Sequence, residues 1–176
     1  EKESCMEGIL AHKEKALEHI LEHLKKTNRI AWPIKIYSKL VGEDELIKVL
    51  LEVINYEDVS FDQSKVDKNY DILCYLMDYK LPDGGQSLLS ITKDHDERVR
   101  YAAAEAILEQ KKPEVVSQLE PFLFDESPEN IRIRQAVVEA YCENAWTIQS
   151  KDIIQTGEFL GGYVITKELQ IKKYNN

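Results

Sequence analysis

Three histidines lie close together in the N-terminal part of the chain, His12, His19 and His23. If this segment is helical, their spacings of seven and four residues place all three on one side of it. Two histidines one turn apart can chelate a transition metal, which makes His19 and His23 weak candidates for a metal site. The apolar stripe of the same segment lies beside the histidines and not under them, so a solvated helix face is the favoured interpretation.

Residues 19–23 read His-Ile-Leu-Glu-His, which fits the H-x-x-E-H string of the inverzincin peptidases. A helix rich in glutamate and histidine produces such a string easily, and nothing else in the chain is similar to those large enzymes. Metal bound from a purification column is therefore a simpler expectation than catalysis. We predict no native metal site and no cofactor.

His95 is the fourth histidine and stands between Asp94 and Asp96. One interpretation is a general base that a neighbouring carboxylate orients. The other is an exposed turn residue, which the turn-forming aspartates on both sides favour. The chain contains no Ser-His-Asp pattern, no phosphate-binding glycine loop and no dinucleotide-binding fingerprint. We therefore expect no catalytic residue.

Cysteine usage indicates a reducing compartment. Cys5, Cys74 and Cys142 are odd in number and far apart, which fits neither a disulfide framework nor a zinc pattern. Cys74 and Cys142 fall on apolar faces of expected helices, so both are predicted to be small core residues. No apolar stretch approaches the roughly 20 residues that span a bilayer, and the charged N-terminus shows no leader pattern. We expect a cytoplasmic protein with no membrane partner.

The charge balance argues against nucleic-acid binding. The 176 residues include 32 acidic and 23 basic side chains, for a formal net charge of −9. Phosphate binding depends on clustered lysine and arginine, which this balance does not supply. Trp32 and Trp146 are therefore predicted to pack in the core or at helix ends and not to stack on bases. The length suits one domain or one short array of repeats.

Apolar residues recur at helical spacing through the first half of the chain. Pro33 suits the start of a helix, Gly42 suits its end, and Asp44 can cap the helix that follows. The stretch 55–64 is polar and predicts a loop, and residues 81–85 predict a turn. The expected helices cover 4–26, 31–41, 44–54 and 65–80.

The second half of the chain repeats itself, which indicates a repeat architecture. The copies are 31 residues apart at first and 34 apart after a three-residue insertion at 126–128. Each copy would form a helix, an aspartate-bearing turn and a second helix. The first set of matches pairs Pro82, Leu88 and Asp94 with Pro113, Leu119 and Asp125, and the second pairs Val99, Arg100, Ala103 and Ala106 with Ile133, Arg134, Val137 and Ala140.

Residues 96–107, Asp-Glu-Arg-Val-Arg-Tyr-Ala-Ala-Ala-Glu-Ala-Ile, resemble the second helix of a HEAT repeat, and residues 130–141 resemble it more loosely. The likeness covers residues 82–145 in detail, and a weaker copy over 44–80 carries Asp67 where the pattern has arginine. The resemblance implies an all-α fold, a short right-handed α-α superhelix of the armadillo-like kind. The implied division is N-terminal capping helices over 1–42, HEAT-like repeats over 43–149 and a C-terminal cap or tail over 150–176.

The resemblance also implies structural roles for single residues. Small residues let the second helices pack closely, so we expect Ala103 to be buried. In the family, aspartate–arginine contacts recur as a ladder through successive turns, and Arg100 and Arg134 would hold the repeats together here. After the last repeat, β-prone runs at 163–165 and 169–171 predict a small hairpin. The residues of the ladder are Asp94, Asp96, Arg100, Asp125 and Arg134.

The repeat favours a binding module, because solenoids present an extended concave face to partners. We expect a non-catalytic protein–protein interaction scaffold or adaptor with a protein partner, as a monomer or weak homo-oligomer. Tyrosine and arginine among acids suit a partner with basic and apolar groups. The alternative is a HEAT-type lyase or chaperone subunit, or another HEAT-like enzyme. The side chains that the core pattern leaves free for contact are Arg98, Tyr101, Glu105, Glu109, Arg132, Gln135, Glu139 and Glu143.

Overall fold

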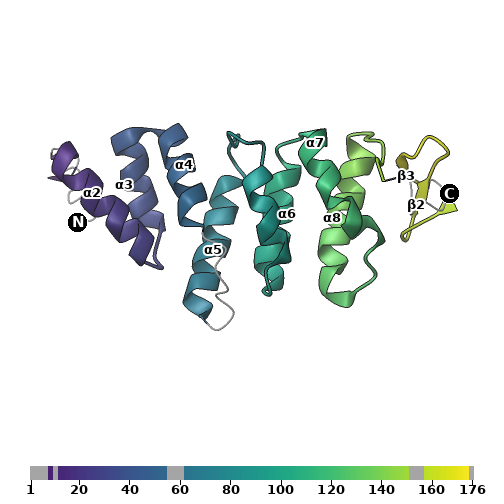
Figure 1. Cartoon of the computed structure of the whole chain (residues 1–176), viewed down its shortest axis with the longest axis horizontal. Coiled ribbons are helices and arrows are strands. Elements are labelled where there is room, and N and C mark those ends of the chain that lie inside the picture. Colours follow the sequence, from purple (N-terminus) through teal and green to yellow (C-terminus); the bar gives the residue numbers. More distant parts are fainter. Residues whose placement is uncertain (1–7, 10–11, 55–61, 151–156, 175–176) are drawn as a thin grey trace. The chain divides into compact units, whose positions relative to one another are not determined.

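The structure is a computed structural model and describes residues 8–9, 12–54, 62–150 and 157–174 (Figure 1). These residues are mainly helical and end in a small antiparallel sheet, which confirms the predicted all-α fold class. The chain forms two compact units, Glu1–Pro82 and Asp83–Asn176, which are described one at a time. The superhelix and the domain boundaries inferred from the sequence stay predictions. Among the helices of the described part, none combines the length and the apolar character that a bilayer crossing demands.

The first unit is a set of packed helices. α2 packs against α3, and α3 packs against α4. The apolar stripes that the sequence predicts form the core, where Leu24, Leu46, Leu50, Ile72 and Leu73 are fully buried. In the described part of this unit the helices are α2 (Lys13–Lys26), α3 (Ala31–Val41), α4 (Glu43–Val53) and α5 (Gln63–Leu76).

The bounds of two helices of this unit, α2 and α5, differ from the ranges that the apolar spacing predicts, although residues 8–9 ahead of α2 are also helical. A turn at His12 precedes α2, and the predicted start of this helix, at residue 4, lies outside the described residues. Asp62 begins α5, because its carboxylate accepts a hydrogen bond from the backbone N–H of Ser64 at 3.1 Å and satisfies a free donor of the first turn. α5 ends at Leu76, before the predicted end at residue 80. Most of the predicted loop, residues 55–61, also lies outside the described residues.

Gly42 connects α3 to α4 without an intervening loop. Its φ of 90° is a conformation that glycine adopts without steric cost, and its N–H donates to the carbonyl oxygen of Ser38. Gly42 therefore ends α3, as predicted. The same residue also precedes α4, which begins at Glu43. The prediction that Asp44 caps this helix is wrong, because Asp44 lies inside the first turn.

Lys68 joins α5 to the end of α2. Its ammonium nitrogen donates to the carbonyl oxygens of Leu24 and Lys25 at 2.8 and 2.7 Å. These carbonyls belong to the last turn of α2, where backbone oxygens lack helical partners and a positive charge is favourable. Lys68 is only 7% exposed, and this burial lowers its pKa. The helix end and the buried amine thus satisfy each other.

The second unit has the predicted order of a repeat twice. The first copy is η1 (Gln86–Lys93) followed by α6 (Glu97–Leu108). The second is α7 (Pro113–Val116), which continues as η2 (Ser117–Phe124) and is followed by the short turn η3 (Pro128–Asn130) and by α8 (Ile131–Glu143). Most of each first helix is 3₁₀ and not α. In η2, Pro121 removes a backbone donor from the helix interior, which disfavours the α form.

Small residues let α6 pack closely against both η1 and α8. Ala102, Ala103, Ala104 and Ala106 are almost fully buried, and Ala103 is 0% exposed, which confirms its predicted burial. Asp96 caps the start of α6 by accepting hydrogen bonds from backbone N–H groups of the first turn. The outward positions of α6 are consequently held in a fixed register next to α8.

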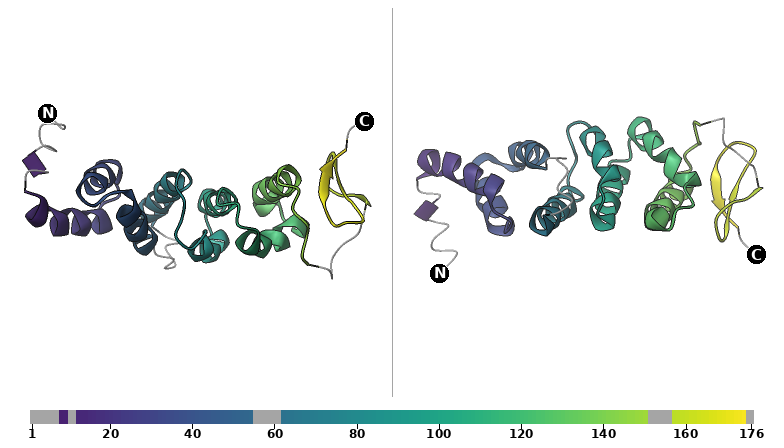
Figure 2. Two further views of the ribbon diagram at one scale, coloured as in Figure 1. Left: turned by 90° about the horizontal axis from the view of Figure 1, so that it is seen from above. Right: turned by 60° about the horizontal axis from the view of Figure 1, so that its bottom comes forward.

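The described residues of the C-terminal segment form a three-stranded antiparallel sheet in the order β1-β2-β3 (Figure 2). The strands are β1 (Gly157–Glu158), β2 (Tyr163–Ile165) and β3 (Ile171–Lys173). β2 and β3 form the predicted hairpin, with Ile165 opposite Ile171. Leu169 has a φ of 60° and lies before β3, so the second strand begins later than predicted. β3 packs against α8, which supports a sheet too small to be stable alone.

Glu120 holds the segment that leaves α8. This residue of η2 is 1% exposed, and its carboxyl oxygens accept a hydrogen bond from the Tyr141 hydroxyl at 2.9 Å. They also accept from the backbone N–H groups of Gln149 and Ser150 at 2.7 and 2.8 Å. Burial, reinforced by the contact with Glu120, raises the pKa of Tyr141. A buried carboxyl group needs such partners, and here they fix the path of the chain after the last repeat.

Candidate functional site

The outward side chains of α6 and α8 form the candidate site. The two helices lie side by side within the second unit (Figure 1). Residues three or four positions apart share one face of a helix, so the outward residues of each helix form a row. The row on α6 contains Tyr101, Glu105 and Glu109, and the row on α8 contains Arg132, Gln135, Glu139 and Glu143.

Toward the C-terminal ends of α6 and α8 this surface forms a pocket of about 400 Å³, which we call the acidic pocket. Its carboxylates come from both helices, with Glu105 in α6, Glu109 at the C-cap of α6, and Glu139 and Glu143 in α8. Among the residues that the structure describes, none of these four glutamates is in an ion pair. The remaining lining residues are Leu108, Lys111, Ala136, Ala140 and Asn144.

A second pocket of about 370 Å³, the tyrosine pocket, adjoins the first because Ala136 and Glu139 line both. The guanidinium carbon of Arg132 stands 4.1 Å from the centre of the Tyr101 ring, a cation–π arrangement that links α8 to α6. Ile131, at 62% exposed, adds an apolar side chain to the rim. The full lining of the tyrosine pocket is Tyr101, Ile131, Arg132, Gln135, Ala136 and Glu139.

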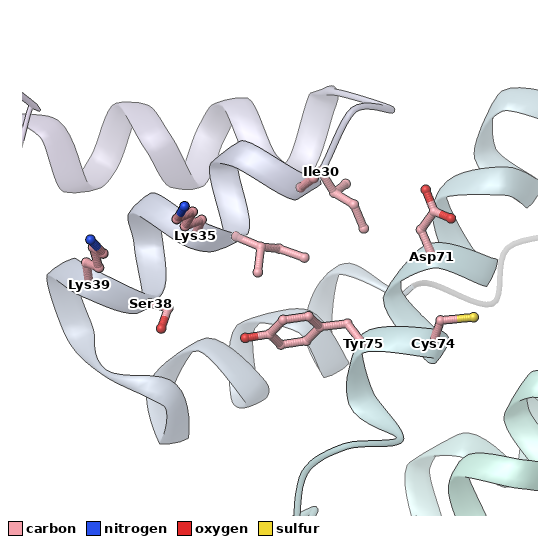
Figure 3. Close-up of a pocket in the computed structure, with 9 residues that line it drawn as sticks. Ile30, Lys35, Ser38, Lys39, Asp71, Cys74 and Tyr75 are labelled. Atoms are coloured by element: carbon pink, nitrogen blue, oxygen red, sulfur yellow. The ribbon is translucent and has the colours of Figure 1, made fainter. Parts of the chain in front are cut away.

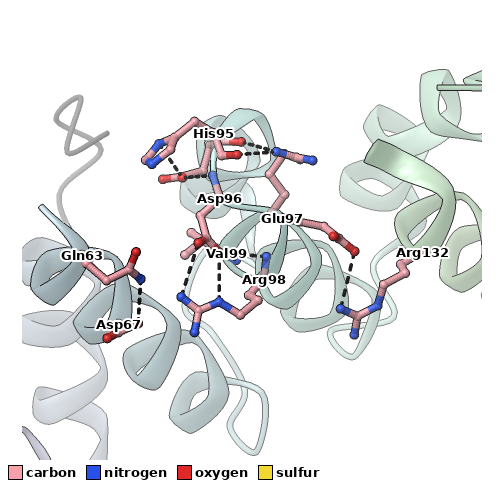
Figure 4. A network of polar contacts seen from close by, with 10 residues as sticks. Gln63, Asp67, His95, Asp96, Glu97, Arg98, Val99 and Arg132 are labelled. Atoms are coloured by element: carbon pink, nitrogen blue, oxygen red, sulfur yellow. Dashed lines mark hydrogen bonds and ion pairs between the residues drawn. The ribbon is translucent and has the colours of Figure 1, made fainter. Parts of the chain in front are cut away.

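The electrostatics of this surface disfavour a further negative charge. Burial raises the pKa of Glu105, and the nearby carboxylates of Glu109 and Glu139 raise it further. Burial and the neighbouring Glu105 also raise the pKa of Tyr101. Arg132 is the cation at this end and forms an ion pair with Glu97 at 3.6 Å (Figure 4). A cationic group that entered the acidic pocket would relieve the repulsion among the glutamates.

All of the predicted contact residues except Arg98 line one of these two pockets. Arg98 turns back to the start of its own helix, where its Nε lies 3.3 Å from the Asp96 carboxylate that caps α6 (Figure 4). Helical spacing alone places these residues in one row, and their role in partner contact stays a prediction. The spacing did not predict that Arg98 would instead contact Asp96, the residue that caps its own helix.

Arg100 has the predicted structural position and donates to turn carbonyls, but not to the carboxylates of the ladder aspartates. Its Nη1 donates to the carbonyl oxygens of Asp94 and His95, both at 2.9 Å, and its Nη2 donates to the carbonyl oxygen of Glu129 at 2.8 Å. Arg100 is 9% exposed, and it ties the turn of the first repeat to the turn of the second. The expected acceptance by the Asp94 and Asp96 carboxylates is wrong. Those carboxylates accept backbone N–H groups of their own turn and helix start instead.

Arg134 behaves in the same way in the second repeat. Its Nε donates to the carbonyl oxygen of Leu123 at 2.9 Å, and its guanidinium stands 5.4 Å from the ring of Phe159. Asp125, its predicted acceptor, accepts instead from Ser127 and Asn130. These hydrogen bonds hold the pKa of Asp125 below its usual value. In both repeats, therefore, the arginine donates to backbone carbonyls, in the turns for Arg100 and near the end of η2 for Arg134, and the aspartate accepts within its own turn.

None of the four histidines lines either pocket. His95 is an exposed turn residue whose Nδ1 is 3.1 Å from the carboxylate of the buried Asp94 (Figure 4). The contact has the orientation that a general base would need, but His95 lines neither pocket. His12, His19 and His23 are exposed around α2. Within the described ranges, no group of three or more His, Cys, Asp or Glu side chains is placed to hold a metal ion.

The two tryptophans pack against protein, as predicted. The ring of Trp146 meets the ring of Tyr141 edge-on, with centroids 5.6 Å apart and planes at 81°. Trp32 is half-buried and packs against the apolar cluster around Ile36 and Leu40. The Nζ of Lys35 lies 5.0 Å from the centre of the Trp32 ring. Neither ring is arranged as a free stacking platform.

Cys74 is exposed, so its prediction as a core residue is wrong. It lines a groove of about 570 Å³ between α3 and α5 in the first unit, which we call the α3–α5 groove (Figure 3). Cys142 is half-buried on α8, and Cys5 lies outside the described residues. The sequence reasoning missed this groove, although Lys35 and Lys39, one turn apart on a helix without acids, were a visible signal. The groove is lined by Ile30, Ala31, Ile34, Lys35, Ser38, Lys39, Asp71, Cys74 and Tyr75.

Comparison with known proteins gives no relative to compare these sites with. No family model matches the chain. No curated protein and no solved structure matches it either. The observations that bear on function are therefore the geometry of the α6–α8 surface and of the α3–α5 groove.

Proposed function

We propose that the chain is a non-catalytic, HEAT-like α-solenoid module that binds another protein through the outward surface of α6 and α8. The observation that carries the proposal is the adjoining pair of pockets, which the four glutamates and the Tyr101–Arg132 contact line together. Each pocket has room for side chains of a partner, and the two share a wall. A surface of this kind suits an extended peptide segment, whereas small molecules favour enclosed pockets.

The chemistry of the two pockets defines the partner segment. A lysine or arginine side chain in the acidic pocket would lie among four carboxylates. Its charge would offset the repulsion that raises the pKa of Glu105. An apolar residue next to it would pack on Tyr101 and on the exposed Ile131. A segment that carries both groups is the partner that this surface favours, in keeping with the complementarity of protein interfaces.

A second function, an enzyme of the HEAT-like kind, has one observation in its favour. Tyr101 and Glu105 interact in the wall between the pockets, and the raised pKa of Glu105 is a property that general acids share. Partial burial, with a smaller contribution from the repulsion of Glu109 and Glu139, accounts for this raised pKa without catalysis. Replacing Glu105 with Gln separates the two functions. A binding surface keeps most of its affinity with an amide there, whereas a general acid loses its reaction.

Site-specific photo-crosslinking in native cell extract tests the binding function. A photoreactive residue at position 135, in the tyrosine pocket, should capture a discrete protein. The same residue at the exposed position 114 on α7, which lines neither pocket, should not. Capture at 135 should disappear when Glu109 and Glu143 are both changed to Lys.

The charge-matched control changes Glu114 and Glu126 to Lys, since both are exposed and lie outside the two pockets. Capture at position 135 that survives the Glu109 and Glu143 changes as well as it survives the control would refute binding through this surface. Equal capture at positions 114 and 135 would refute it too.

A further inference from the structure

The α3–α5 groove lies in the first unit, and the proposed function does not use it. Its floor is apolar, with Ile30 and Ile34 from α3 and the ring of Tyr75 from α5 (Figure 3). Tyr75 is held in place by stacking on Tyr79, with ring centroids 4.9 Å apart. At about 570 Å³ the groove lies in the size range of specific binding sites, and its floor therefore offers a preformed apolar surface.

The α3 side of the groove is positively charged. α3 contains Lys35 and Lys39 and no acidic residue, in a chain whose formal net charge is −9. Both lysines are exposed and line the groove one turn apart (Figure 3). Among the described residues neither forms an ion pair, although Lys35 lies over the ring of Trp32. The opposite side carries a single carboxylate, Asp71.

We propose that the α3–α5 groove docks an amphipathic helix of a partner protein, with apolar residues on the groove floor and acidic residues one turn apart facing Lys35 and Lys39. Helices dock in grooves of this kind by laying residues at i, i+3 or i+4, and i+7 into the apolar floor. Side chains four positions apart on a helix have Cβ atoms about 6 Å apart. Acids at that spacing on the partner therefore match the two lysines.

This groove is distinct in chemistry from the surface of α6 and α8. A helix that carries acids toward Lys35 and Lys39 would be repelled by the glutamates of the acidic pocket. A basic segment suited to the acidic pocket would in turn meet two lysines at the groove. The two sites therefore select partners of opposite charge, and each can fail its test without the other.

Selection from a displayed library of 16-residue peptides, with the full chain as the target, tests the proposal. One class of enriched peptides should combine an apolar stripe with acidic residues at i and i+4. Their binding, measured by fluorescence anisotropy, should weaken at least about tenfold when Lys35 and Lys39 are both changed to Glu, a factor that corresponds to one decade in Kd. They should also protect Cys74, and not Cys142, from alkylation, as read by mass spectrometry of the digested protein.

Two further variants keep the result interpretable. Lys15→Glu with Lys65→Glu makes the same change in net charge at exposed positions outside the groove and should leave peptide binding unchanged. Ala31→Trp fills the groove from an exposed position and should abolish binding without loss of the folded state, as checked by thermal melting.

Four results would overturn the proposal. Peptides that protect Cys74 but carry basic residues in place of the acidic ones would do so, and so would Cys74-protecting peptides that bind the Lys35 and Lys39 double variant as well as the control. Failure of every selected peptide to protect Cys74 would place the binding elsewhere. Light scattering could also show that the chain self-associates and that the Lys35 and Lys39 double variant does not. That result would assign the groove to a second copy of the chain and not to a partner helix.

Discussion

Arg132 of α8 lies over the ring of Tyr101 of α6, with its guanidinium carbon 4.1 Å from the ring centre. The same guanidinium reaches Glu97, at the start of α6, at 3.6 Å. Arg132 therefore bridges two repeats on their outward surface, as Arg100 bridges them through the turns. The surface that we propose for partner binding is thereby held in one arrangement before a partner arrives, which lowers the entropy cost of binding.

The Tyr101–Arg132 contact should be measurable as a coupling energy. A double-mutant cycle with Tyr101→Leu and Arg132→Met should give a coupling of about 0.5–1 kcal/mol in urea denaturation, as expected for an exposed cation–π pair. Additive effects at the Tyr101–Arg132 pair would mean that the two side chains do not interact in solution.

The ionised Glu105 carboxylate should lower the free energy of unfolding at neutral pH. Its pKa is raised in the folded protein, so the folded state holds the proton more tightly than the unfolded chain does. Stability therefore falls as the pH rises from the ordinary glutamate value through the raised one. Glu105→Gln should stabilise the protein at pH 7, and the gain should vanish below pH 4. A melting series from pH 3 to pH 8 checks this, and a gain independent of pH would contradict it.

Lys68 should contribute to stability through its two carbonyl acceptors. Lys68→Met keeps the apolar stem but leaves the Leu24 and Lys25 oxygens without their donor, at a cost of about 1–3 kcal/mol. Lys65→Met, on the exposed side of the same helix, should change the free energy of unfolding by less than about 0.5 kcal/mol. Equal effects of the two changes in chemical denaturation would show that the amine is not a helix-end partner.

Arg100 should stabilise the fold without contributing to binding. Arg100→Ala removes the donor from three carbonyl oxygens and should lower the free energy of unfolding by about 1–3 kcal/mol. Arg98→Ala, which changes an exposed side chain two residues earlier, should cost less. Photo-crosslinking at position 135, carried out well below the melting temperature, should be unaffected by Arg100→Ala. Loss of crosslinking at unchanged stability would make Arg100 a recognition residue.

The sequence predicted those features that follow from neighbours along the chain. Helical spacing placed Tyr101, Glu105 and Glu109 in one row, and the small residues around Ala103 predicted its burial. Gly42 was recognisable as a helix end because the requirement for a positive φ is local. Local chemistry of this kind decides the order of elements and the face that each helix turns outward.

Features that depend on contacts across the fold were not predictable in the same way. Cys74 follows the apolar residues of α5 closely, but a helix exposes whatever its neighbours leave uncovered, and no neighbour covers this position among the described residues. The acceptors of Arg100 depend on where the next turn places the carbonyl of Glu129, which no spacing rule gives. The 3₁₀ form of η2 had a local signal in Pro121, which a prediction of helix alone does not use.

The way Glu120 holds the chain after α8 has a consequence for sequence variation. Two of its three hydrogen-bond donors are main-chain N–H groups, of Gln149 and Ser150, and every residue except proline supplies such a donor. Positions 149 and 150 should therefore accept almost any substitution over evolutionary time, with proline excluded. Position 120 has no such freedom, because a shorter or apolar side chain would leave both amides and the Tyr141 hydroxyl without their acceptor. Relatives of this chain should thus keep an acid at position 120 and vary in sequence at positions 149 and 150.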